Sequence, residues 1–165
     1  MDINVIGLKF VKLDWYGDFK YMIYENINNN THDSLFIYND NEESKDNKSY
    51  GNGAGNAVIR RFNCNNPKYT NKPYSAGIPT GTLRDGGYNE LNENSKKYID
   101  ESVNEIKLLI ETHKYKNLYY SIDELDGKLG TSIFNVNDDV IDYITNKIHK
   151  LSKHPIQLFC MLENK

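Results

Sequence analysis

The chain has 165 residues with a formal net charge of −3, and this length suits one globular domain, predicted over residues 1–165. No apolar run reaches the roughly 18–20 residues that a membrane span needs, and no signal peptide precedes the first apolar stretch. The two cysteines argue against a disulfide framework or a structural zinc site, and the negative charge argues against general nucleic-acid binding. We therefore expect a soluble, cytoplasmic protein without a membrane partner, a metal or a cofactor.

The first 33 residues are predicted to be strands. Apolar residues alternate from Leu8 to Leu13, and Phe19 to Ile27 is rich in β-branched and aromatic residues, with a plausible turn at Tyr16 to Asp18. We therefore expect an N-terminal β-hairpin extension over residues 1–33, ahead of a core over residues 34–165.

The core is predicted to begin with a buried strand at Ser34 to Tyr38, because buried strands read as continuous apolar runs. Residues 39–53 are polar and predict a long loop, and Gly55 to Phe62 predicts a short helix at a glycine-rich turn. A strand is expected at Ala76 to Thr80, where Pro79 indicates an edge or a strand end.

The helical signals lie in the second half. Apolar residues at helical spacing predict a helix from Glu93 to Thr112, capped by Asn92 or Asn94, and a second helix that follows Asn137. Strands are expected at Leu118 to Ile122 and at Ile156 to Leu162. This alternation predicts an α/β domain with a mixed, largely parallel sheet, and in such domains ligands bind beyond the carboxyl ends of the strands.

Glycine and arginine concentrate between residues 51 and 87, where all three arginines of the chain lie: Arg60, Arg61 and Arg84. Within this segment, the alternate glycines of Gly51 to Ala57 permit positive φ and close approach of a ligand to backbone amides. The pattern is neither a P-loop nor a dinucleotide-binding fingerprint. It predicts either a phosphate-binding loop or a flexible polar loop tip.

Two further polar segments follow predicted strands. Gly127 to Ser132 predicts a second anion-binding turn or a simple β-turn. Asn39, Asp40 and Asn41 predict either an Asx turn or a ligand contact, in which Asp40 would bind a base or ribose hydroxyl or activate water.

These motifs resemble a small family of phage, bacterial and large DNA virus proteins. The resemblance rests on the segments Phe36 to Asn41, Gly53 to Arg60, Ala76 to Thr80 and Leu129 to Phe134, and it spans roughly residues 34 to 151. Asn39 and Ser132 stand where the family pattern has glycine. Members of this family look like compact relatives of macro domains, the α/β modules that bind ADP-ribose.

The resemblance implies a three-layer, macro-like α/β domain, in host cytoplasm if the source is viral, that binds ADP-ribose or a related phosphorylated nucleotide. A hydrolase of ADP-ribosyl or ADP-ribose-phosphate substrates is the alternative, with Asn56 and Asp40 as its catalytic residues. A third hypothesis is a viral or phage protein that binds a host protein through the N-terminal hairpin, or that sequesters an NAD-derived defence signal. The remaining ligand-binding residues are expected to be Asn39, Asn41, Gly53, Ala54, Gly55, Arg60, Thr80, Gly130, Thr131 and Ser132.

Overall fold

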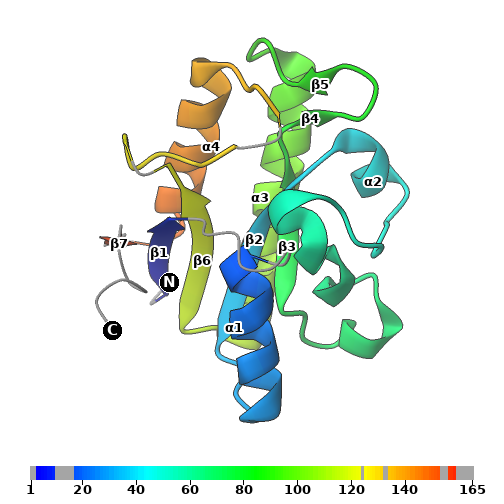
Figure 1. The fold of residues 1–165 in the computed structure, drawn as a ribbon, viewed down its shortest axis with the longest axis vertical. Helices are drawn as coiled ribbons and strands as arrows, with labels where there is room; N and C mark the ends of the chain where they lie inside the picture. The colour runs from blue at the N-terminus through cyan, green and yellow to red at the C-terminus, as the bar shows by residue number, and fades with distance from the viewer. Residues whose placement is uncertain (1–2, 10–16, 124, 132–133, 153–155, 159–165) are drawn as a thin grey trace.

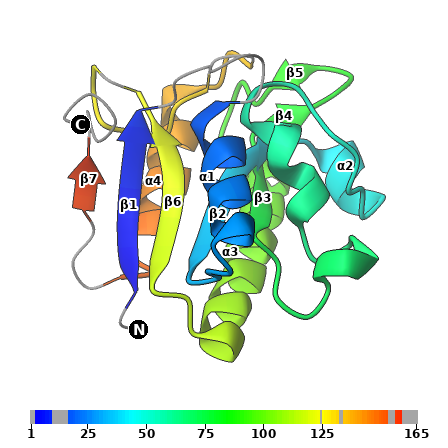
Figure 2. The same cartoon turned by 60° about the horizontal axis from the view of Figure 1, so that its bottom comes forward.

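The computed structural model describes residues 3–9, 17–123, 125–131, 134–152 and 156–158. Its central feature is a parallel sheet in the order β3-β2-β6-β1-β7 (Figure 2). The strands are β1 (Asn4–Lys9), β2 (Ser34–Asp40), β3 (Ser75–Pro79), β6 (Asn117–Ile122) and β7 (Ile156–Leu158). Two short strands, β4 (Gly81–Thr82) and β5 (Gly86–Gly87), form a separate antiparallel pair. The predicted α/β class with a largely parallel sheet is confirmed.

Helices cover both faces of the sheet (Figure 1). Residues alternate along β2, so Leu35 and Ile37 pack with α3 (Glu93–His113) and α4 (Asp138–His149). The intervening Phe36 and Tyr38 pack on the other face with α1 (Gly17–Asn28) and the 3₁₀ helix η1 (Gly55–Phe62). Neither these helices nor the short α2 (Glu42–Asp46) and η2 (Pro67–Tyr69), all within the described part of the chain, are long and apolar enough to cross a bilayer.

The predicted N-terminal hairpin extension is wrong. β1 is an internal strand, hydrogen-bonded in parallel to β6 and β7, and the predicted second strand is the helix α1. Phe19 and Ile23 are both buried, and Met22 and Ile27 pack beside them, which is a helical spacing that the β-branched and aromatic composition obscured. The predicted hairpin surface for a host protein is thus a helix surface.

Most of the core elements match their predicted positions. β2, β3, α3, β6 and α4 occupy the expected segments, and Asn92 rather than Asn94 caps α3 through a capping box with Ser95. β3 is an edge strand, as Pro79 predicted. Of the predicted last strand, Ile156 to Leu158 is β7, and the rest lies outside the described residues.

The predicted long loop over residues 39–53 is only partly a loop. Its first two residues complete β2, and residues 42–46 form α2. The Asn41 side chain caps α2 by accepting a hydrogen bond from the Ser44 amide. The acidic run that follows Asn41 therefore contains the first turn of a helix, where negative charge is stabilised.

The order of the strands creates a switch point between β2 and β6. The chain leaves β2 toward β3 on one side and leaves β6 toward β7 on the other side. The connection after β2 contains η1 and packs on one face of the sheet, whereas α4 packs on the opposite face. The two loops diverge and leave a crevice beyond the carboxyl ends of the strands, which is where open α/β sheets bind ligands.

Candidate functional site

A cavity of about 620 Å³ occupies this switch point. It is lined from the ends of β1, β2 and β6, from the loop into η1, and from the segments after β3 and before α4. The structure brings together at this cavity every predicted site residue that it describes: Asn39, Asp40, Asn41, Gly53, Ala54, Gly55, Asn56, Arg60, Thr80, Gly130 and Thr131. Ser132 lies outside the described residues.

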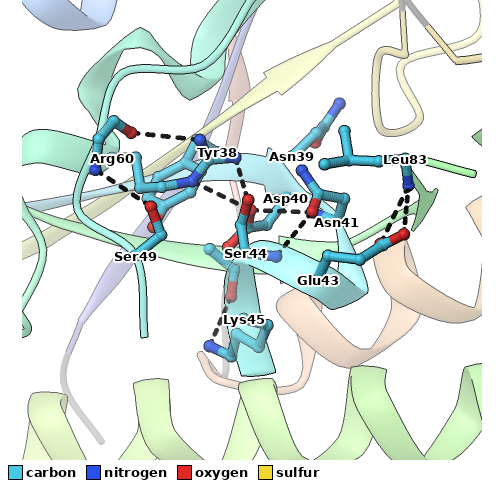
Figure 3. A network of polar contacts seen from close by, with 12 residues as sticks. Tyr38, Asn39, Asp40, Asn41, Glu43, Ser44, Lys45, Ser49, Arg60 and Leu83 are labelled. Atoms are coloured by element: carbon cyan, nitrogen blue, oxygen red, sulfur yellow. Dashed lines mark hydrogen bonds and ion pairs between the residues drawn. The ribbon is translucent and has the colours of Figure 1, made fainter. Parts of the chain in front are cut away.

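A buried ion pair forms part of the wall (Figure 3). Arg60 donates from Nε and Nη2 to Oδ1 of Asp40, at 3.1 and 2.7 Å, and the Asn41 amide donates to the same oxygen at 2.9 Å. Both charged side chains are almost fully buried, with 6% and 3% of their surfaces exposed. Arg60 also donates from Nη1 to the Gly51 carbonyl, so this side chain joins the end of β2 to the glycine-rich loop.

Two positions of the loop require glycine for different structural reasons. A Cβ on Gly53 would lie 2.7 Å from Nη1 of Arg60 and 2.8 Å from Cβ of Ala57, so only glycine fits against the ion pair. Gly55 has a φ of 59°, the left-handed region that glycine enters without steric cost. Gly53 leaves room for the Arg60 side chain, and Gly55 begins η1.

The Asn56 side chain joins two strand ends. Its Oδ1 accepts a hydrogen bond from the Asn39 amide at 2.9 Å, and its Nδ2 donates to Oγ of Ser121 at 3.0 Å. The Asn39 side chain donates in turn to the Gly130 carbonyl at 2.8 Å. These bonds link the ends of β2 and β6 to both glycine-containing loops, and they position the cavity walls.

Three backbone amides at the start of η1 have no acceptor among the described residues. Within the described chain, the amides of Ala54, Gly55 and Asn56 donate no hydrogen bond, whereas the next amide, that of Ala57, donates to the Ala54 carbonyl. The first amides of a helix cannot be satisfied inside it, and they form a ready site for an anion. All three residues line the cavity.

An apolar side chain outside the predicted site residues also lines the cavity. Leu83, in the turn between β4 and β5, is 65% exposed. Glu43 holds this turn: its carboxylate accepts from the Leu83 amide at 3.0 Å and from the Arg84 amide at 3.3 Å (Figure 3). The hydrogen bond from Leu83 is the main reason that the pKa of Glu43 lies below its ordinary value.

The other two arginines do not reach the cavity. Arg84 is exposed and pairs with Asp85, and the Arg61 guanidinium lies 5.3 Å from the ring centroid of Phe62. Among the described residues, no group of three or more histidine, cysteine or acidic side chains is arranged to hold a metal ion. Besides the Asp40–Arg60 pair, the polar residues that line the cavity are Lys9, Asp123 and a set of asparagine, serine and threonine residues.

Comparison with known proteins identifies no relative: the chain matches no family model, no curated protein and no solved structure. The family resemblance continues to rest on the motifs in the sequence alone.

Proposed function

We propose that this protein binds ADP-ribose or a related phosphorylated nucleotide, as a macro-like domain. The observation that carries the proposal is the cavity at the β2/β6 switch point, lined by Ala54, Gly55 and Asn56, whose amides donate no hydrogen bond within the described chain. Small-molecule sites typically enclose about 300–1,000 Å³, and this cavity falls in that range. Successive backbone amides at a glycine-rich turn bind phosphate oxygens.

The contacts of the two predicted catalytic residues favour binding over hydrolysis. Asp40 directs Oδ1 to Arg60, and Asn56 uses its side-chain oxygen and nitrogen on Asn39 and Ser121. A general base must have an oxygen within hydrogen-bond reach of the attacking water. These contacts support positioning roles for both side chains, and the hydrolase alternative has no observation of its own in its favour.

Calorimetric titration with ADP-ribose tests the proposal. We expect saturable binding, and at a hundredfold excess of ligand over Kd the free energy of unfolding should rise by about 2.7 kcal/mol. Absence of binding by ADP-ribose, NAD and nucleoside diphosphates would overturn the proposal. Chromatography of the titrated ligand separates binding from turnover, because hydrolysis would yield a second species.

A matched pair of variants at Ala54 tests where the phosphates bind. Ala54 is the N-cap residue of η1, and it is exposed in the cavity wall. Ala54→Asp and Ala54→Asn introduce side chains of the same shape, both able to cap the helix, but only Asp adds a negative charge. We expect Ala54→Asp to weaken ADP-ribose binding well beyond Ala54→Asn. Equal affinities would place the phosphates elsewhere.

A further inference from the structure

We propose that Leu83 contacts the base of the bound nucleotide and that Glu43 is the residue that positions it; this inference rests on the proposed function. Leu83 presents a largely exposed apolar side chain to the cavity. A nucleotide has one large surface suited to such a contact, the face of its aromatic base. The phosphates, by contrast, require the donors found at the start of η1.

Two large apolar side chains of the cavity wall that are at least partly exposed lie beside the β4–β5 pair: Leu83 and Phe134. Phe134, from the segment before α4, is partly exposed and is the second such apolar side chain among the described lining residues. A Cβ built on Gly87 of β5 would lie 3.0 Å from Cβ of Phe134, so β5 packs directly against this segment. In the close-up of the site Leu83 and Arg60 lie at opposite sides (Figure 3), and Arg60 is the residue that bonds the Gly51 carbonyl of the glycine-rich loop.

Glu43 explains why the Leu83 turn keeps its position. β4 and β5 pair over only two residues each, which is too little sheet to fix the turn between them. Both carboxylate oxygens of Glu43 accept from the Leu83 amide, and one also accepts from the Arg84 amide. Glu43 is anchored in α2, whose cap Asn41 directly follows β2. The turn is thereby connected to the end of β2.

The first test compares two leucines of almost equal exposure. Leu83 is 65% exposed and Leu108, on α3 and outside the cavity, is 64% exposed. We expect Leu83→Ala to raise the Kd for ADP-ribose about five- to tenfold, because burial of part of an apolar side chain by the base is lost. Leu108→Ala should leave the Kd unchanged. Equal Kd values for the two variants would overturn the contact.

The positioning role is tested by a double-mutant cycle. If Glu43 acts through Leu83, Glu43→Ala should weaken binding in the wild-type background and add nothing in the Leu83→Ala background. A purely structural role of Glu43 would give the same loss in both backgrounds, and that result would overturn the positioning role.

Methyl NMR of leucine-labelled protein tests the contact with the base directly. The Leu83 methyl signals, assigned by their loss in Leu83→Ala, should shift upfield on saturation with ADP-ribose, since they would lie over an aromatic face. Leu83 signals that stay in place while amide signals of the Gly51 to Asn56 loop move would overturn this inference and leave nucleotide binding intact. If no signal moves with any nucleotide, the proposed function itself fails.

Discussion

Replacement of Asp40 by asparagine should severely destabilise this protein. The variant keeps the shape of the side chain but leaves the Arg60 guanidinium buried without a compensating charge. The wild-type pair is 6% and 3% exposed, so solvent screening, which reduces the energies of surface ion pairs, does not apply. Removal of one partner from a buried pair costs about 3–5 kcal/mol.

That cost is large compared with the stability of a typical domain, about 5–15 kcal/mol. For a chain of this length each kcal/mol lowers the midpoint of thermal unfolding by about 2–4 °C, so Asp40→Asn should lower it by about 6–20 °C. Urea denaturation followed by circular dichroism measures the same change as a free energy. Stability within 1 kcal/mol of wild type would refute the reasoning.

Two controls separate charge from shape. Asp40→Asn/Arg60→Met removes both charges and should be more stable than Asp40→Asn alone, because no buried charge remains uncompensated. Arg84→Met disrupts the exposed pair with Asp85 and should leave the unfolding curve unchanged.

Three further changes probe the glycine-rich loop, the cap of α3 and the partly buried His149. Gly53→Ala should destabilise the protein by about 1–3 kcal/mol, because its Cβ would lie 2.7 Å from the buried Arg60 guanidinium. Gly51→Ala is the control: its Cβ would meet only a serine oxygen at 3.7 Å, so its urea denaturation curve should match that of the wild type. Asn92→Ala should cost about 1 kcal/mol through loss of the cap, and Asn94→Ala less than about 0.5 kcal/mol; equal losses in thermal unfolding would contradict the capping role. Burial lowers the pKa of His149, so its contribution to stability is complete above about pH 6.5 and is lost as the pH falls below that value. His149→Gln should therefore reduce the difference in unfolding free energy between pH 7.5 and pH 5.5. An unchanged difference would show that His149 does not contribute to the pH dependence of stability.

The second half of the fold could be predicted because its signals are local. The apolar residues of α3 recur at helical spacing and Asn92 supplies its cap, so neither depends on distant contacts. The helix α1 was mistaken for a strand because Tyr, Phe and Ile favour strands, and only packing on the sheet reveals the helical face of Phe19 and Ile23.

The position of the candidate site could be predicted from the sequence, but the contacts that its side chains make with one another could not. The carboxyl ends of parallel strands lie at the same edge of the sheet, so Asn39 at the end of β2 and Gly130 after β6 are expected near each other, and they are hydrogen-bonded. That Asp40 pairs with Arg60 depends on the path of η1, which no local pattern specifies. Leu83 carried one usable signal: an apolar residue inside a short glycine-flanked polar turn.

The hydrogen bonds around Asn39 have a consequence for affinity. Its backbone amide bonds the Asn56 side chain and its own side chain bonds the Gly130 carbonyl, so the protein itself cross-links the two glycine-containing loops. A ligand that enters a preorganised site does not have to immobilise the loops, and less of its interaction energy is lost as conformational entropy. The pair Asn39 and Asn56 thus reduces the part of the interaction energy that binding spends on ordering the loops.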